Sequence, residues 1–128
     1  MKIDAIDHFV ITVRDIEATC KFYSEVLGMQ VITFGADQRK ALTFGRQKIN
    51  LHEAGKELEP KAAKPVPGSA DFCLITSIPM PEIVKHLREL NITIEVEPSP
   101  RTGAVNKLES VYVRDPDGNL VEISNERP

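Results

Sequence analysis

Apolar and polar residues alternate over residues 5–13, and this period of two predicts a β-strand. Phe9, Ile11 and Val13 would point to one face and pack in the core, while His8 would point to the other face. The same kind of pattern predicts the remaining strands of the fold. They cover residues 31–34, 39–44, 48–53, 72–76, 92–96, 110–114 and 119–124.

Two helices are predicted between these strands. Asp15 is a suitable N-cap residue, and apolar residues then recur at helical spacing through residues 16–27. Residues 80–90 carry the second helical stripe, with Pro81 suited to the first turn. Met80 would be the N-cap of this helix, although methionine is a poor capping residue.

Two segments lack such a pattern. Residues 54–68 are rich in Lys, Glu and Pro, and we interpret them as a linker. Residues 98–108 contain Pro98 and Pro100, and we interpret them as a long loop. Because long loops in a compact domain are often lids, Arg101 becomes a candidate for binding a substrate carboxylate or phosphate. The alternative is that Arg101 is simply exposed and solubilising.

The second half of the chain repeats the first. His8 and Asp71 occupy equivalent strand positions, and Gly28 and Asn91 follow the two helices at the same spacing. The last strands match at a longer spacing, because the second half carries extra residues within 98–108. A repeated βαβββ pattern indicates the architecture of the whole chain.

This repeat predicts an α+β fold in which two βαβββ modules form a cupped, open-barrel mixed sheet with the helices outside. The modules would cover about residues 5–53 and 69–124, joined by the linker 54–68, within a single domain of residues 1–128. Each sheet would keep one face free of its helix. Those two faces could surround a shared concave site.

Composition excludes several classes of protein. The charged fraction is 27% and the net charge is −3, which gives no indication of a nucleic-acid partner. No apolar run approaches the length that crosses a membrane, and the start of the sequence lacks the pattern of a signal peptide. A cytoplasmic location is therefore expected. Cys20 and Cys73 have no metal or redox spacing, so we expect buried free thiols.

Polar side chains gather on the predicted concave face. Glu122 lies in the strand after the turn signal of residues 115–118, between apolar neighbours that face the other way. A histidine and carboxylates that converge on a cleft form a recognised divalent metal site. The alternative is that His8 hydrogen-bonds a backbone group while the carboxylates are solvated. The residues predicted on this face are His8, Asn50, His52, Asp71, Ser110, Tyr112 and Glu122.

Three motifs give the chain a resemblance to the vicinal oxygen chelate superfamily, which includes glyoxalase I, fosfomycin-resistance transferases, bleomycin-binding proteins and extradiol dioxygenases. They are Asp-His-Phe-Val at residues 7–10, Phe-Tyr-x-x-Val-Leu-Gly-Met at 22–29 and Arg-Asp-Pro-Asp-Gly-Asn-Leu-Val-Glu at 114–122. More narrowly, residues 48–53, 65–69 and 100–104 are similar to glyoxalase-domain-containing protein 5 and related bacterial proteins. The resemblance implies paired modules, a bound metal, a small-molecule substrate and a homodimer.

The resemblance also assigns roles to individual residues. His8 and Glu122 match the family's ligands on the first and last strands, whereas Asp71 replaces a histidine and Asn50 replaces an acidic ligand. We therefore expect His8, Asp71 and Glu122 to bind a divalent ion, Ni, Zn, Mn or Fe. Glu122 is also the candidate catalytic base. His52 is interpreted as a surface residue, a substrate contact or a substitute ligand, in that order.

Three functions fit this reading. The first is a glyoxalase-type, metal-dependent lyase or isomerase, with Arg101, His52, Asn50 and Tyr112 contacting a small carbonyl or vicinal-oxygen substrate. The second is a metal-dependent dioxygenase or transferase on the same scaffold. The third is a non-enzymatic small-molecule-binding protein of the resistance type, which the absence of tryptophan and the aromatic content of 5% disfavour.

Overall fold

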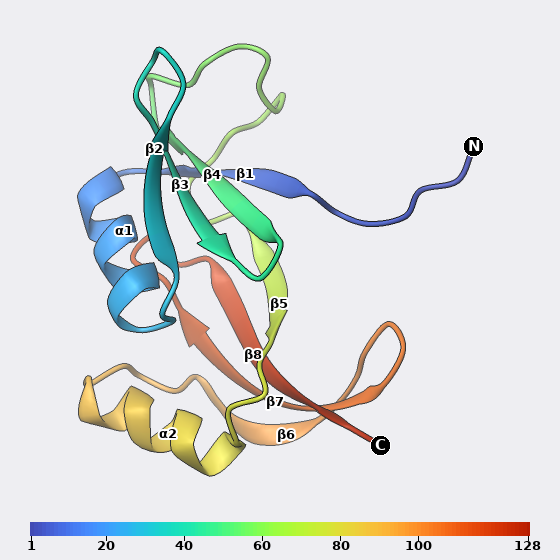
Figure 1. Ribbon diagram of the computed structural model, residues 1–128. Coiled ribbons are helices and arrows are strands. Elements are labelled where there is room, and N and C mark those ends of the chain that lie inside the picture. Colours follow the sequence, from blue (N-terminus) through green and yellow to red (C-terminus); the bar gives the residue numbers. More distant parts are fainter. The chain divides into compact units, whose positions relative to one another are not determined.

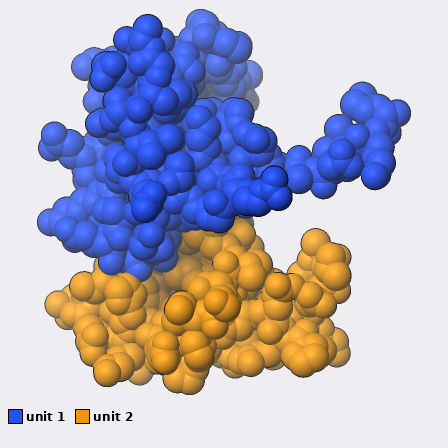
Figure 2. All heavy atoms as spheres, in the orientation of Figure 1, with its two compact units in different colours: residues 1–69 blue, residues 70–128 orange.

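The computed structural model of the chain describes all residues 1–128. The chain divides into two compact units, Met1–Ser69 and Ala70–Pro128, which are coloured separately in Figure 2. Each unit contains one helix and one four-stranded mixed sheet, as the ribbon in Figure 1 shows. The prediction of an α+β fold built from two βαβββ modules is confirmed.

Unit 1 contains a sheet in the order β1-β4-β3-β2. The outer strand β1 runs parallel to β4, and the other neighbours are antiparallel. The helix α1 separates β1 from β2 in the sequence, which allows the parallel pair because such a connection must cross over. The elements of this unit are β1 (His8–Val13), α1 (Ile16–Glu25), β2 (Gln30–Phe34), β3 (Arg39–Phe44) and β4 (Gln47–Glu53).

Unit 2 repeats this topology in the order β5-β8-β7-β6, with β5 parallel to β8. The strands β6, β7 and β8 pair antiparallel. Neither helix of the chain is long and apolar enough to cross a membrane. The elements of this unit are β5 (Asp71–Ile75), α2 (Met80–Glu89), β6 (Val96–Thr102), β7 (Lys107–Arg114) and β8 (Leu120–Arg127).

The helix α1 begins and ends as its sequence predicts. The Asp15 carboxylate accepts a hydrogen bond from the Ala18 backbone N–H at 3.0 Å, which satisfies one of the free donors of the first turn. Gly28 then takes a φ of +69°, where a residue without Cβ is unstrained. Tyr23 on this helix is fully buried, as are Leu42 and Ile49 on the sheet.

The fully buried valines of unit 2 share one face of its sheet, and the other face carries Ser110 and Ser124, which are also fully buried. Val111, Val113 and Val121 are fully buried, and they alternate with residues that point to the other side of the sheet. The helix α2 buries Ile83 and Leu87, one turn apart. The opposite face of this sheet is therefore free to carry polar side chains.

Two predictions about α2 and its surroundings need correction. Pro79, and not Met80, is the N-cap residue, and no side chain caps this helix. The strand expected over residues 92–96 does not form, since β6 begins only at Val96. Asn91 nevertheless adopts the left-handed φ of +56° expected after the helix.

The expected lid over residues 98–108 is also wrong. Pro98 and Pro100 lie within β6, an edge strand of the sheet, where proline is tolerated because an outward backbone donor is not needed. A bulge between Val96 and Ser99 accommodates the change in register. The loop shrinks to residues 103–106, and Arg101 belongs to a strand.

Candidate functional site

Glu122 lies on the sheet face of unit 2 that is opposite the buried valines. It pairs with Cys73 on the parallel neighbour β5 and with Tyr112 on the antiparallel neighbour β7. Side chains of directly paired residues share a face, so the three groups lie side by side. Asp71 lies two residues before Cys73 on β5, so it is on the same face of the sheet, and its side chain is exposed. The strand register thus determines which side chains lie beside Glu122.

A chain of polar contacts runs from β6 to Glu122. The Arg101 Nε donates a hydrogen bond of 2.9 Å to the Tyr112 hydroxyl, and its guanidinium carbon lies 5.2 Å from the centre of the tyrosine ring. The Tyr112 side chain faces Glu122 across the paired strands, and this contact raises the pKa of Tyr112. Because a phenol has one proton, a hydroxyl that accepts from Arg101 is free to donate to the carboxylate. Arg101 therefore orients Tyr112 beside Glu122.

Two buried serines support the other side of Glu122. The Ser124 hydroxyl lies 2.6 Å from that of Ser110 and 3.2 Å from the Cys73 sulfur. It also donates to Glu122 Oε2 at 3.4 Å. Ser110 and Ser124 are both fully buried, so their positions are fixed by packing as well as by these bonds. The carboxylate is thus held by hydroxyls from two different strands.

Burial and the neighbouring carboxylate change how these groups titrate. Burial raises the pKa of Tyr112, the hydrogen bond from Arg101 lowers it, and the contact with Glu122 raises it again. Burial also raises the pKa of the Cys73 thiol, and the charge of Glu122 acts in the same direction. Cys73 is therefore held as a neutral thiol more firmly than a free cysteine would be.

The cysteine prediction holds only in part. Both thiols are free, but Cys20 is half-buried and Cys73 is exposed, so the expected burial is wrong for Cys73. The reason is its position on β5, where it alternates with Phe72 and Leu74. Alternation alone could have placed Cys73 and Ser124 on the face of Glu122.

A pocket of about 380 Å³ opens beside Glu122 within unit 2. Its size is in the range of small-molecule sites. The loop between β6 and β7 forms one wall, and β5 and β8 form the others. The lining residues are Cys73, Ile75, Thr102, Gly103, Ala104, Val105, Asn106, Leu108, Glu122 and Glu126.

Unit 1 positions the other predicted residues on β1 and β4. His8 is exposed, and its Nδ1 lies 2.7 Å from the carboxylate of Asp7, an arrangement that leaves Nε2 for another partner. Asn50 pairs with Val10 on the face that carries His8, and its buried Oδ1 has no hydrogen-bond partner. His52 is buried, which corrects its interpretation as a surface residue.

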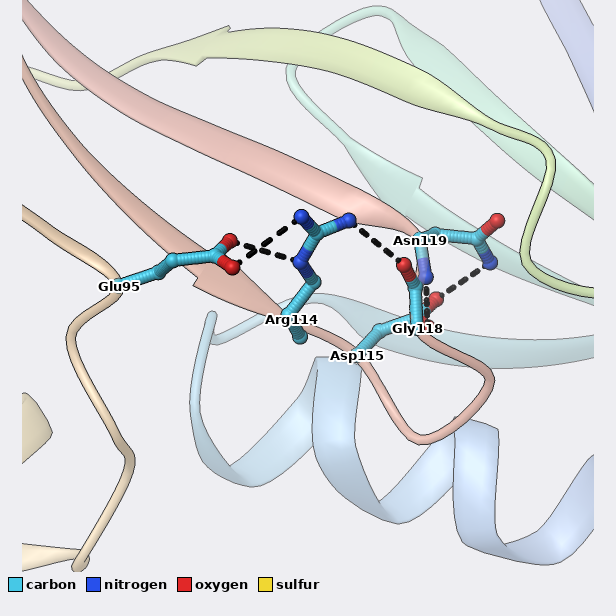
Figure 3. Close-up of polar contacts among 5 residues, drawn as sticks. All are labelled: Glu95, Arg114, Asp115, Gly118 and Asn119. Carbon is cyan, nitrogen blue, oxygen red and sulfur yellow. Dashed lines mark hydrogen bonds and ion pairs between the residues drawn. The ribbon is translucent and has the colours of Figure 1, made fainter.

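The turn before Glu122 is built around Asp115, as Figure 3 shows. The buried Asp115 carboxylate accepts from the backbone N–H of Asn119 at 3.0 Å and from its side-chain amide at 2.8 Å. The Asn119 Oδ1 accepts in turn from the Ala70 N–H at 2.8 Å. This bond ties the start of β5 to the start of β8, and so helps to set Cys73 opposite Glu122.

Arg114 braces the same turn from its exposed side. It makes two hydrogen bonds to the Glu95 carboxylate, of 2.7 and 3.2 Å, and one of 3.1 Å to the Gly118 carbonyl (Figure 3). Gly118 has a φ of +88°, which glycine adopts without strain. The motif that carried the family resemblance thus has a structural role in placing β8.

The structure brings together only some of the predicted site residues. Arg101, Tyr112 and Glu122 form one connected group in unit 2, whereas His8, Asn50 and His52 belong to unit 1. Neither unit by itself gathers three histidine, cysteine, aspartate or glutamate side chains that could hold a metal ion. The three-residue ligand set therefore remains a prediction.

Replacing Arg101 with Met is expected to raise the pKa of Tyr112 further, because the hydrogen bond that favours the phenolate is lost. The titration can be followed by ultraviolet absorbance in a Tyr23→Phe background, since the chain has two tyrosines and no tryptophan. Arg39→Met provides a control elsewhere in the chain. A pKa of Tyr112 that falls or stays constant in Arg101→Met would contradict the contact.

Residues 5–123 match the family model described as the Glyoxalase/Bleomycin resistance protein/Dioxygenase superfamily. The chain belongs to this superfamily, as the three sequence motifs and the paired βαβββ units indicated. Superfamily membership defines the scaffold and the general class of ligand site, and leaves the reaction open.

Particular relatives are close in sequence and structure. The chain is 55% identical over 124 residues to Virulence protein STM3117 of Salmonella typhimurium, covering 97% of this chain and 85% of that protein. It is 50% identical over 125 residues to Glyoxalase domain-containing protein RDO1 of Mycosarcoma maydis, covering 98% and 70%. A crystal structure of STM3117 superimposes with a TM-score of 0.97, at 54% identity over 99% of this chain and 100% of that chain. A lactoylglutathione lyase from Agrobacterium tumefaciens superimposes with a TM-score of 0.73, at 26% identity over 98% and 96%.

Proposed function

We propose that this protein is a metal-dependent lyase or isomerase of the glyoxalase type, acting in the cytoplasm on a small carbonyl or vicinal-oxygen substrate. The observation that supports the proposal most is the arrangement around Glu122. A carboxylate at the wall of a pocket lies beside Tyr112 and accepts a hydrogen bond from Ser124, with Arg101 behind the tyrosine. This gives a base with a fixed orientation beside a space for a small molecule. The solved lactoylglutathione lyase structure adds support at the level of the family.

His8, Asp71 and Glu122 would hold the divalent ion. The donor set is suitable, because one imidazole nitrogen and two carboxylates suit Ni, Zn, Mn or Fe. Asp7 orients the His8 ring and leaves Nε2 available, as is usual for metal-binding histidines. The unpartnered Oδ1 of Asn50 on the same face of unit 1 also favours a polar occupant. The ion would supply polarisation of the substrate oxygens.

The residues of this chain would then move the proton. When its carboxylate is released from the ion, Glu122 would take a proton from the hydroxyl-bearing carbon beside the carbonyl and return it to the carbonyl carbon, while the hydroxyl proton passes to the former carbonyl oxygen, so that the reaction is a net isomerisation. Tyr112 lies beside the carboxylate on the paired strand, and Arg101 keeps the tyrosine in place through its hydrogen bond. Asn50 and His52 remain candidates for contacting substrate from unit 1.

The test combines metal analysis with an assay. Elemental analysis of the purified protein should find a divalent metal, and protein reconstituted with Ni, Mn or Zn should isomerise hemithioacetals of methylglyoxal formed with glutathione or with 2-mercaptoethanol. Turnover of neither hemithioacetal by metal-loaded protein would contradict the proposal. Oxygen consumption with a vicinal diol substrate would instead indicate the dioxygenase alternative.

We also propose a homodimer, as the family resemblance implies. Large apolar side chains remain exposed, including Ile6 at 65% and Val10 at 45%, and a partner could cover them. Analytical sedimentation should give twice the chain mass of 14.3 kDa at micromolar concentration. A single-chain mass at high micromolar concentration would overturn the dimer.

A further inference from the structure

We propose that the pocket beside Glu122 selects small carbonyl compounds that carry no negative charge, and that it favours a cationic substituent. The inference rests on the proposed function for the identity of the reacting group. The selectivity itself follows from the pocket alone. Its determinants are the charges and the apolar side chains that line the cavity.

Every charged group that lines the pocket is a carboxylate. Glu122 lies at one wall and Glu126 at another, and no lysine or arginine is among the lining residues. Asp71 adds a third carboxylate to the same sheet face. The metal-free pocket is therefore negative, and when a divalent ion is bound by Asp71 and Glu122 the carboxylate of Glu126 remains uncompensated, so an anionic ligand would be repelled on entry.

Arg101 is a cation next to the lining residue Thr102, and two of its guanidinium nitrogens are already hydrogen-bonded. It pairs with Leu108 in the strand register, so it lies on the same face as the pocket. Its Nε and Nη1 donate to Tyr112 and to the Pro100 carbonyl, and its plane lies over the tyrosine ring. Arg101 is therefore a positioning residue for Tyr112, which differs from the anion-binding role expected from the sequence.

The carboxylate of Glu126 is fixed at the pocket by the loop that forms its wall. The Asn106 side-chain amide donates a hydrogen bond to Glu126, and the Gly103 N–H donates to the Asn106 carbonyl at 2.9 Å. A Cβ at Gly103 would lie 2.5 Å from that carbonyl, so the loop needs glycine here. The loop therefore holds the Glu126 carboxylate at the pocket, where its charge favours a cationic substituent of the ligand.

Four apolar side chains also line the pocket. Ile75, Ala104, Val105 and Leu108 line a volume of about 380 Å³. Such walls favour a compact ligand with an uncharged body, because burying a charged group there without a partner is unfavourable. A cationic substituent gains from Glu126, whereas a glutathione conjugate brings two carboxylates. The substrate class is accordingly a compact neutral or cationic carbonyl compound.

Cys73 provides a direct measure of the pocket charge, because it lines the pocket and is exposed. Methanethiosulfonate reagents convert its thiolate into a mixed disulfide and release methanesulfinate. We would compare the cationic trimethylammonium-ethyl reagent with the anionic sulfonato-ethyl reagent in a Cys20→Ser background, which leaves one thiol. The ratio of the two rates cancels the thiolate fraction, which is the same for both reagents.

In metal-free protein, the cation-to-anion rate ratio of Cys73 is expected to exceed that of free N-acetylcysteine by about tenfold or more, since two carboxylates line the pocket. Glu126→Gln should lower this excess at least about threefold. Glu109→Gln, which removes a carboxylate from the opposite face of the same sheet, should leave it unchanged. A ratio equal to that of N-acetylcysteine, or an equal fall in both variants, would overturn the inference.

Turnover provides the second readout. Hemithioacetals of methylglyoxal with 2-(dimethylamino)ethanethiol, 2-mercaptoethanol and 3-mercaptopropionate differ in charge and little in size. We expect kcat/KM to be highest for the cationic hemithioacetal, intermediate for the neutral one and lowest for the anionic one. Glu126→Gln should reduce the differences in kcat/KM among the three. If none of the three reacts while the Cys73 ratio stays high, the proposed function fails and the charge selectivity stands. If all react equally and the ratio is that of the free thiol, the selectivity fails and the function stands.

Discussion

Replacing Glu122 with Gln should weaken binding of Ni, Mn or Zn at least about 100-fold and abolish isomerase turnover. The reason is that glutamine keeps the shape of the side chain but removes the charge that both roles require. Loss of a residue that only hydrogen-bonds a metal ligand typically costs about 10–100-fold in affinity or activity. Loss of a residue that binds the metal directly should cost more. Calorimetric titration of each metal into the metal-free protein measures the affinity.

The control for this variant is Glu109→Gln, on the opposite face of the same strands. It should keep the metal affinity and the activity of the parent protein. Circular dichroism should show that Glu122→Gln is folded, because the contacts of Ser124 and Tyr112 to residue 122 can also be made to an amide. Unchanged affinity in Glu122→Gln, or binding of no metal by the parent protein, would leave Glu122 as an ordinary hydrogen-bonded side chain.

Replacing Asn119 with Leu should lower the free energy of unfolding by about 2–4 kcal/mol, because the Ala70 N–H loses its acceptor and the buried Asp115 carboxylate loses one donor, each at a cost of about 1–3 kcal/mol. Asn119 is 1% exposed. Its side-chain amide donates to the buried Asp115 carboxylate, and its Oδ1 accepts from the Ala70 N–H. Leucine removes both of these side-chain hydrogen bonds, while the Asp115 carboxylate keeps the backbone N–H donors of residues 117 and 119. Equilibrium unfolding in urea gives the free energy directly.

Glu95→Gln is the matched control for this measurement, because Glu95 braces the same turn from an exposed position. Its ion pair with Arg114 is solvent-screened, so the loss should be about 1 kcal/mol or less. A second effect is expected in Asn119→Leu, since the tie between β5 and β8 is loosened. Cys73 should then react faster with a neutral thiol reagent. Equal stability of the two variants would show that the buried network contributes little.

Local patterns predicted most of the elements. Residues 16–25 form a helix because Asp15 satisfies its first turn and the apolar stripe finds a core, and both signals are short-range. The alternation around Glu122 likewise predicted correctly that Tyr112 shares its face. The repeat of βαβββ indicated the fold because each unit folds from contacts among its own strands.

Pairing between strands determined two features that the local pattern did not predict, the strand β6 and the contacts of Arg101. Pro98 and Pro100 indicated a loop, but their place at the edge of a sheet permits a strand, and only the sheet order shows which strand is at the edge. The same holds for the contacts of Arg101, which became visible only when β6 paired with β7.

The sequence by itself determined the two modules, the start of α1 and the face on which Glu122 lies, because these depend on spacing along one strand or helix. The tertiary structure decided that Cys73 is opposite Glu122, that Arg101 orients Tyr112 and that carboxylates line the pocket. The physical reason is that strand register and side-chain direction depend on partners far away in the chain, which no local spacing encodes.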